Sequence, residues 1–180
     1  MQTVSEIDTA QICLNGHVVN LSCKNNPKVS TSHCPQCGEK TITACLHCSA
    51  PIRGAAYYKR ALFATSSGVC SVPKLIESEY PVPAYCHNCG APYPWTESLL
   101  QEADAIIDSF EELSDEQRIL LKERFPDLLS DTPRTISSAL TFSKLINGLT
   151  SVGSAVGKGF LINLLEKHIP ETIFTLMQLR

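Results

Sequence analysis

The sequence lacks several features that would assign it a function directly. Residues 1–10 have neither a basic start nor an apolar run, so we expect no signal peptide and a cytoplasmic location. No run of about 20 predominantly apolar residues occurs, which argues against a transmembrane helix. The His-Glu-x-x-His, zinc-deaminase, Gly-x-Ser-x-Gly and phosphate-loop motifs are all missing. The sequence therefore shows no sign of an enzyme.

Cysteine, by contrast, is abundant, with nine residues in a chain of 180. Six of them form Cys-x-x-Cys pairs, namely Cys34 with Cys37, Cys45 with Cys48 and Cys86 with Cys89. Two intervening residues let one turn direct both sulfurs at one ion, which is the spacing of a metal site. Gly38 and Gly90 follow two of the pairs and tolerate the positive φ that such a knuckle needs. We predict structural zinc held by reduced thiols.

Three pairs supply six ligands, whereas two tetrahedral zinc sites need eight. The missing two should lie upstream, and Cys13 with His17 in Cys-Leu-Asn-Gly-His is the preferred candidate. Cys23 is the alternative to His17 as a ligand. Cys70, and Cys23 when it is not a ligand, are expected to be small buried side chains. The remaining knuckle histidines, which are His33, His47 and His87, are expected beside the sites.

Two pairings of the four knuckles are open. In the sequential scheme, the first site contains Cys13, His17, Cys34 and Cys37, and the second contains Cys45, Cys48, Cys86 and Cys89. In the cross-brace scheme, the first knuckle joins the third and the second joins the fourth. Residues 41–44 alternate like a short strand that leads from one knuckle into the next. This strand favours the sequential scheme. A second strand is expected over residues 54–64, followed by a turn over 65–68.

Charge is distributed unevenly along the chain. Residues 1–96 hold seven basic and five acidic residues, residues 97–131 hold three and eleven, and residues 132–180 hold five and two. Bound zinc would bring the first segment to about −1, because its thiolates outnumber the metal's charges. Nucleic-acid binding through Arg53, Lys59 and Arg60, with Tyr57 and Tyr58 for base stacking, is therefore an alternative that we do not favour.

The second half of the sequence is helical in pattern. A first amphipathic helix is expected over residues 97–112 with Thr96 as its cap. Ser114 and Gln117 form the pattern of a capping box for a second helix, which should stop near Phe125 and Pro126. A third helix should run from residue 131 to Gly148, with its proline in the first turn and its glycine at the end.

The apolar tail covers residues 149–180. It contains a Gly-x-x-x-Gly spacing at Gly153 and Gly157, and a final short helix is expected over residues 170–179. Lys158, Asn163 and Glu166 interrupt the apolar run, so a transmembrane role is not expected. Close packing or self-association through the small residues is favoured over a peripheral membrane contact.

Several motifs in combination resemble a bacterial zinc-ribbon family that is catalogued only as a domain of unknown function. They are Cys-Leu-Asn-Gly-His, Cys-Pro-Gln-Cys-Gly, Cys-Leu-His-Cys with Pro-Ile-Arg-Gly behind it, and Tyr-Cys-His-Asn-Cys-Gly-Ala-Pro-Tyr-Pro-Trp-Thr. The resemblance covers about the first half of the chain and extends loosely into the helices. It implies a bacterial cytoplasmic protein and ligand roles for Cys13, His17, Cys34, Cys37, Cys45, Cys48, Cys86 and Cys89, but it supplies no activity.

Together these observations predict an α+β protein with tandem zinc ribbons over residues 1–95 and a helical region over residues 96–180. The helical region divides into acidic helices (97–131) and apolar helices (132–180). We expect a non-catalytic adaptor with two structural Zn²⁺ ions that acts through a protein partner or as a homo-oligomer. A nucleic-acid-associated regulator and a membrane-active effector using residues 149–180 are the alternatives.

Overall fold

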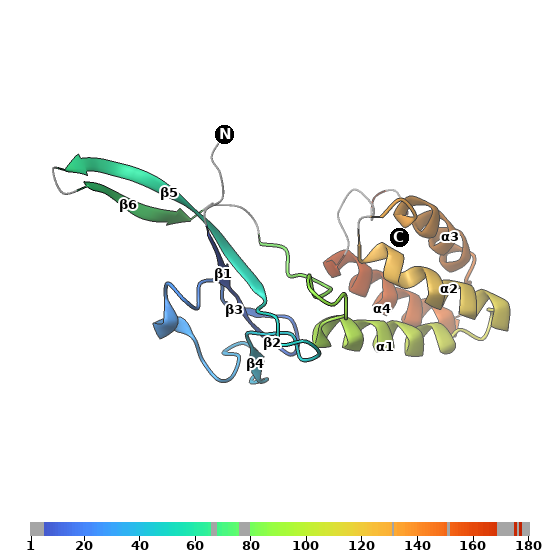
Figure 1. Ribbon diagram of the computed structural model, residues 1–180. Helices are drawn as coiled ribbons and strands as arrows, with labels where there is room; N and C mark the ends of the chain where they lie inside the picture. The colour runs from blue at the N-terminus through green and yellow to red at the C-terminus, as the bar shows by residue number, and fades with distance from the viewer. Residues whose placement is uncertain are drawn as a thin grey trace. The chain divides into compact units, whose positions relative to one another are not determined.

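The computed structural model describes residues 6–65, 68–75, 80–130, 132–150, 152–168, 175 and 177. The chain forms two compact units, Met1–Thr96 and Glu97–Arg180. Among these described residues, short antiparallel strands lie in the first half and four α-helices in the second, which confirms the predicted α+β class (Figure 1).

The longer sheet of the first unit has the strand order β1–β5–β6, with β1 at Glu6–Thr9, β5 at Arg53–Thr65 and β6 at Gly68–Leu75. In Figure 1, β5 and β6 continue alongside each other beyond the end of β1. The predicted strand over residues 54–64 is thereby confirmed, whereas β6 was not predicted. Gly54 is required where β5 begins, because a Cβ there would lie 2.3 Å from the carbonyl oxygen of Leu21.

The second sheet has the order β3–β2–β4, with β2 at Gln11–Cys13, β3 at Val18–Asn20 and β4 at Thr41–Ile42. The strand predicted over residues 41–44 is thus present as β4. Ile12 pairs with Val18 on one side and with Ile42 on the other. The core beneath this sheet is small and includes two sulfur ligand candidates; it consists of Ala10, Ile12, Cys45, Ile52, Cys86 and Tyr93.

Three buried polar side chains hold the segment between β3 and the next knuckle, which contains the short helix η1 at Pro27–Val29. The carboxylate of Asp8 accepts hydrogen bonds from the backbone N–H groups of Lys24 and Asn25 at 2.9 and 3.1 Å. Gln11 bonds to both backbone groups of Thr31, and the Asn20 amide donates to the Asn26 carbonyl. The loop therefore has a defined path although it lacks an apolar core of its own.

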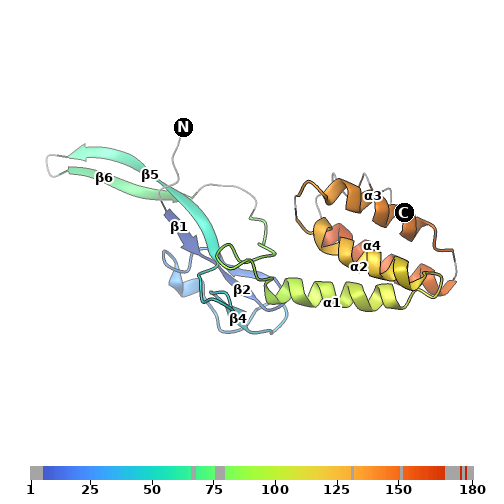
Figure 2. The ribbon, with the colours of Figure 1, turned by 45° about the vertical axis from the view of Figure 1, so that its right-hand side comes forward.

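The second unit contains α1 (Pro94–Asp108) from Glu97 onward, together with α2 at Asp115–Leu128, α3 at Thr135–Asn147 and α4 at Val152–His168. Figure 2 shows α2 and α3 side by side. Their contact includes Phe125 and Phe142, whose ring centroids are 5.9 Å apart. The core of this unit is continuous and draws on all four helices, since Ala103, Phe125, Phe142 and Leu161 all belong to it.

Two predicted features of α1 were wrong. Thr96 lies inside the helix and does not cap it, because its hydroxyl donates to the carbonyl of Ala84 at 2.8 Å. The helix begins instead at Pro94, whose fixed φ suits a first helical turn. It ends at Asp108 rather than at residue 112, and the Phe110 N–H donates to the carbonyl of Ile107 at 3.2 Å. Phe110 is fully buried, so the departing chain still belongs to the core.

The later helices correct two more boundaries and the conformation of one helix end. The Ser114 and Gln117 capping box is confirmed, but α2 continues past Pro126 to Leu128. Burial of Leu128 and its neighbour Phe125 offsets the cost of a proline in the last turn. The third helix begins at Thr135 rather than at residue 131. It ends before Gly148 as predicted, although Gly148 has a φ of −74° and is not a left-handed cap.

The small residues of α4 support close packing within this unit. A Cβ at Gly157 would lie 2.7 Å from Cε1 of Phe110, so the helix surface and the aromatic ring are in direct contact. Most of the final helix predicted over residues 170–179 lies outside the described residues. Among the helices that are described, none combines the length and apolarity needed to cross a membrane.

Candidate metal centres

The three Cys-x-x-Cys knuckles share one backbone frame. In each, the N–H of the residue after the pair donates to the carbonyl of the first cysteine; these bonds join Gly38 to Cys34, Ser49 to Cys45 and Gly90 to Cys86 at 2.8 to 2.9 Å. The N–H of each first cysteine donates in turn to the carbonyl five residues later. These paired bonds close a tight loop, so the spacing in the sequence fixes the local shape.

Positive φ angles occur where the sequence predicted them. Gly38 and Gly90 have φ of 76° and 73° as the chain leaves their knuckles. Ser49 takes the same position after Cys48 with a φ of 59°, and it is the sole non-glycine residue with positive φ among those described. The knuckle geometry thus forces a serine into a backbone region that favours glycine.

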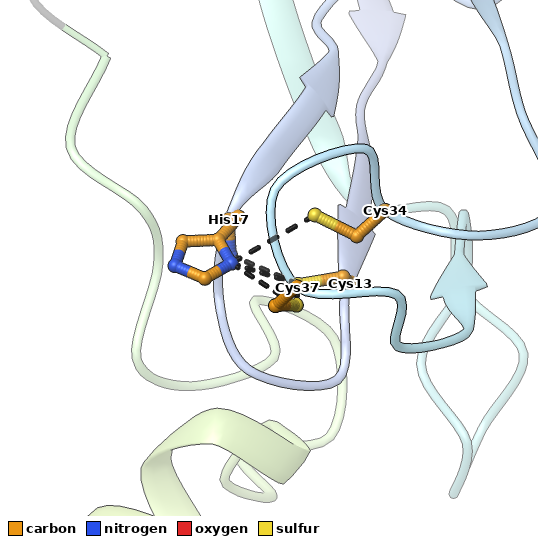
Figure 3. Close-up of side chains that lie close together, drawn as sticks. All are labelled: Cys13, His17, Cys34 and Cys37. Carbon is orange, nitrogen blue, oxygen red and sulfur yellow. Dashed lines mark hydrogen bonds between the residues drawn. The ribbon is translucent and has the colours of Figure 1, made fainter.

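The first candidate site brings together Cys13, His17, Cys34 and Cys37, whose ligand atoms all lie within 4.8 Å of one another. Figure 3 shows the Nδ1 atom of His17 facing the three sulfurs. This nitrogen lies 3.6 Å from the sulfur of Cys13, 3.3 Å from that of Cys37 and 3.8 Å from that of Cys34. β2 carries Cys13, and the turn that joins β2 to β3 carries His17.

The second candidate site brings together Cys45, Cys48, Cys86 and Cys89 within the same limit. The sulfurs of Cys45 and Cys89 are 3.8 Å apart, and those of Cys48 and Cys86 are 3.7 Å apart. The first cysteine of each knuckle is buried, with 3% of its surface exposed for both Cys45 and Cys86, and the second lies closer to solvent. Two segments separated by the long β5–β6 hairpin therefore meet at this site.

The distances fit a tetrahedral ion. Zinc–sulfur bonds of about 2.3 Å place tetrahedral sulfurs about 3.8 Å apart, and a histidine nitrogen about 3.6 Å from them. The sulfur separations of 3.7 to 3.8 Å in the structure match this expected sulfur–sulfur distance. A disulfide would need a sulfur separation of about 2.05 Å, and the described cysteines are all free. The donor set, with seven thiols and one imidazole, suits zinc.

Hydrogen bonds to sulfur favour the thiolate forms that a metal needs. Backbone N–H groups of Cys89 and Asn88 lower the pKa of the Cys86 thiol to about 6. The N–H of Ala91 acts on Cys89 in the same direction, but the neighbouring sulfurs outweigh it and raise the pKa of Cys89 to about 12. Four thiolates this close would repel one another in the absence of a metal. A bound dication would remove that repulsion.

The aromatic residues of the Pro-Tyr-Pro-Trp motif pack against the knuckles of both sites. Tyr93 is 1% exposed within the core that contains Cys45 and Cys86. Its ring stacks on Trp95 with centroids 4.7 Å apart. A Cβ on Gly16 would lie 3.2 Å from Cβ of Trp95, so the turn of the first knuckle rests against that side chain. The motif residues after the last knuckle therefore pack against the first.

The structure thus groups the eight residues as the sequential scheme predicted, and it places His17 rather than Cys23 in the first group. Cys23 was expected to be buried, but it is only partly so: it lies in the loop held by Asp8, with its sulfur 3.7 Å from the Ser30 hydroxyl. The side chains of Tyr58, Lys59, Arg60 and Cys70 lie outside the described residues. His33, His47 and His87 belong to neither group.

The pattern of ligands in the sequence gave no role to Asn15 and Asn88. Their side-chain amides lie 3.5 Å from the sulfur of Cys37 and 3.6 Å from that of Cys48, respectively. Both asparagines stand inside motifs that the sequence made conspicuous, Cys-Leu-Asn-Gly-His and Cys-His-Asn-Cys. The two asparagines could therefore be noticed in the sequence, but their contacts with sulfur depend on which knuckles pair.

Comparison with known proteins gives one family. A family model described as "Uncharacterized protein conserved in bacteria (DUF2321)" matches residues 6–173. No curated protein and no solved structure matches the chain.

Proposed function

The chain belongs to this family of uncharacterized bacterial proteins, and from that premise we propose that it is a non-catalytic adaptor whose first unit holds two structural zinc ions. The observation that carries the proposal is the completeness of the two ligand groups. Each provides four protein ligand atoms within 4.8 Å of one another, which would complete the coordination shell of a tetrahedral ion. A catalytic zinc would need a position free for water or substrate.

Bound zinc would supply cross-links rather than chemistry. The first site would be held by Cys13, His17, Cys34 and Cys37, and the second by Cys45, Cys48, Cys86 and Cys89. The apolar core of the first unit contains few large side chains. In such small domains, metal binding contributes directly to folding. The two ions would therefore support a platform on which loops and the β5–β6 hairpin are displayed.

Exposed apolar side chains of the helical unit support a role in protein contacts or self-association. Ile136 and Leu140, one turn apart on α3, are 57% and 53% exposed. Val156 and Phe160, one turn apart on α4, are 62% and 65% exposed. Large apolar groups repeated along one helix face are typical of surfaces that bind another protein.

Metal analysis tests the first part of this proposal. We expect about two zinc ions per chain in the purified protein, and about one after Cys45→Ser with Cys48→Ser. Cys23→Ser is the matched control and should leave two, because Cys23 belongs to neither ligand group. A wild-type protein that binds no zinc, or a Cys23 variant that loses an ion, would contradict the assignment.

Light scattering after size-exclusion chromatography tests the second part. If the α3 surface mediates self-association, wild type should exceed the 19.7 kDa of one chain, and Leu140→Glu should return it to that mass. Gln101→Glu, which adds the same charge at an exposed position on α1, away from the α3 surface, should leave the assembly intact. A protein that is strictly monomeric and recovers no partner from a bacterial lysate would remove the adaptor proposal.

A nucleic-acid-associated regulator is the second candidate, and one observation favours it. The residues that form β5 and β6 include Arg53, Lys59, Arg60 and Lys74, and residues 53–75 contain no acidic residue. A basic two-stranded ribbon fits a nucleic-acid groove. Binding that weakens as salt rises would support this candidate, and no binding to DNA or RNA at low salt would remove it. The membrane-active effector that uses residues 149–180 stays an untested alternative.

A further inference from the structure

We propose that Asn15 and Asn88 are positioning residues that control how long each metal site retains its zinc. The inference rests on the proposed zinc-binding role and adds a mechanism for it. It comes from two independent observations, one in each site. Neither residue is a ligand, and both belong to motifs that the zinc-ligand spacing leaves unexplained.

The first observation concerns Asn15, in the turn between Cys13 and His17. Its Nδ2 donates to the sulfur of Cys37 at 3.5 Å, across 22 residues of sequence. Cys37 is the exposed cysteine of its knuckle, whereas Cys34 is 3% exposed. The amide therefore reaches from one knuckle to the outward-facing sulfur of the other.

The second observation repeats this arrangement with different chain connections. Asn88 lies between Cys86 and Cys89, and its Nδ2 donates to the sulfur of Cys48 at 3.6 Å, across 40 residues of sequence. Cys48 is half-buried, and its knuckle partner Cys45 is 3% exposed. In both sites an asparagine of one knuckle thus donates to the second, more exposed cysteine of the opposite knuckle.

This placement has a physical consequence for metal retention. Release of zinc begins when one ligand separates from the ion, and a chelator or proton reaches the less buried sulfurs first. Cys37 is exposed, and Cys48 is less buried than Cys45 and Cys86 in its site. An amide donor reduces the charge on the sulfur and joins the two halves of the site beside the metal. Breaking the site open then requires the loss of a hydrogen bond as well as a metal bond.

The chain provides its own matched control. Gln36 lies at the position in its knuckle that Asn88 occupies in another, and it is also an exposed amide. Among the contacts of the described residues, Gln36 reaches a sulfur only through its backbone N–H, which is 3.4 Å from the sulfur of Cys34. Removing its side chain should leave both sites unchanged.

The test is zinc release from the intact two-zinc protein to a colorimetric chelator. Changes to groups that orient metal ligands typically cost 10–100-fold in affinity, so we expect release of one zinc equivalent to speed up about tenfold or more in Asn15→Ala and in Asn88→Ala. Gln36→Ala should match wild type. Alkylation followed by mass spectrometry should identify the first-site cysteines as freed early in Asn15→Ala, and the second-site cysteines in Asn88→Ala.

Asn88→Asp separates the hydrogen bond from packing. The carboxylate has nearly the volume of the amide but cannot donate and repels the thiolate, so release should be at least as fast as in Asn88→Ala. Wild-type rates in the asparagine variants, slow release in Asn88→Asp, or alkylation of the wrong site would overturn the inference while leaving the zinc proposal intact. A wild-type protein without zinc would remove both.

Discussion

At the scale of single residues, the buried carboxylate of Asp8 shows how polar groups replace a core in the first unit. Asp8 is 2% exposed. Burial by itself would raise its pKa, but the backbone N–H groups of Lys24, Thr9 and Asn25 outweigh it and lower the pKa below its usual value. The charged carboxylate is therefore the form that holds the loop after β3.

The lowered pKa of Asp8 predicts a pH dependence. A depressed folded-state pKa contributes stability above the unfolded value of about 3.9, and that contribution is lost as the pH falls through the folded pKa. Asp8→Asn replaces an acceptor with a donor facing N–H groups, so we expect a loss of about 1–3 kcal/mol at pH 7. Urea unfolding at several pH values measures it.

The difference between wild type and Asp8→Asn should narrow toward acidic pH, since protonation removes the same charge. Asn25→Ala is a milder companion, because Asn25 supplies one side-chain donor at 2.8 Å and its backbone N–H remains. A constant difference between wild type and Asp8→Asn from neutral to acidic pH would contradict the assigned role of the charge.

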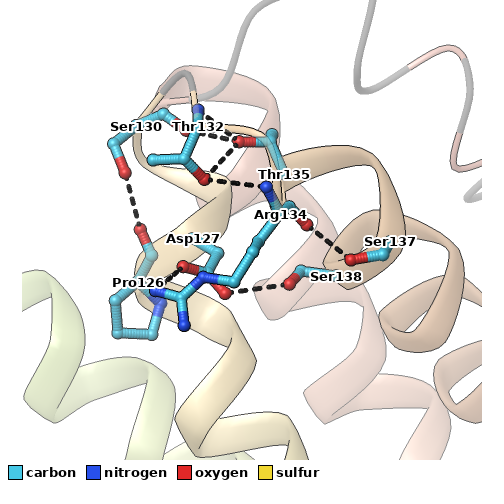
Figure 4. A network of polar contacts seen from close by, with 8 residues as sticks. All are labelled: Pro126, Asp127, Ser130, Thr132, Arg134, Thr135, Ser137 and Ser138. Carbon is cyan, nitrogen blue, oxygen red and sulfur yellow. Dashed lines mark hydrogen bonds and ion pairs between the residues drawn. The ribbon is translucent and has the colours of Figure 1, made fainter.

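At the scale of elements, the junction of α2 and α3 shows why a proline does not end α2. Figure 4 shows Asp127, in the last turn of α2, between Arg134 and Ser138. Its carboxylate accepts a buried hydrogen bond from the Ser138 hydroxyl at 3.0 Å and forms an ion pair with Arg134 at 3.1 Å. The end of α2 is thus fixed by groups that follow Pro126 by several residues.

The α4 helix offers a matched pair of glycines. A Cβ at Gly157 would meet the buried ring of Phe110 at 2.7 Å, whereas a Cβ at Gly159 would meet nothing within 4 Å. Gly157→Ala forces the ring or the helix to move and should cost about 1–3 kcal/mol. Gly159→Ala should stabilise by up to about 1 kcal/mol, because alanine is the better helix former.

Thermal unfolding followed by helical circular dichroism compares the two variants directly. The sign of the difference is the informative result. If both substitutions stabilise the protein equally, the contact between α4 and Phe110 does not determine the packing. If both destabilise it, the contact with Phe110 would not account for the difference expected between Gly157 and Gly159.

At the scale of the whole molecule, the two units differ in what stabilises each of them internally. Among the described residues, the first contains both ligand groups and a small core cluster of six buried residues. The second has a core cluster of fifteen described buried residues, drawn from its helices and the segments next to them, and none of the ligand residues. Metal dependence should therefore be confined to the first unit.

Chelation tests this division. Removing zinc should unfold the first unit, because its ligands become repelling thiolates or unpaired thiols and its core is small. The second unit should keep its helical circular dichroism and its heat-induced transition. Lowering the pH should promote the same loss, since protons compete with the metal for its thiolate ligands. Simultaneous loss of all helical signal on chelation would contradict the division.

The sequence by itself determined the features that depend on neighbouring residues. Cys-x-x-Cys spacing with a following glycine dictates a knuckle, and Ser114 with Gln117 dictates a helix start, because each needs contacts only a few residues apart. The strand of residues 54–64 followed from local pattern in the same way. The class of the protein and the identity of most candidate ligands were therefore readable without coordinates.

Only the tertiary structure decided which distant segments meet. It chose one of two knuckle pairings, selected Nδ1 of His17, and brought Asn15 and Asn88 to sulfurs 22 and 40 residues away. It also paired β6 with β5 and extended α2 beyond Pro126. These outcomes depend on burial and hydrogen bonds between segments remote in sequence, and local propensity carries no information about such contacts.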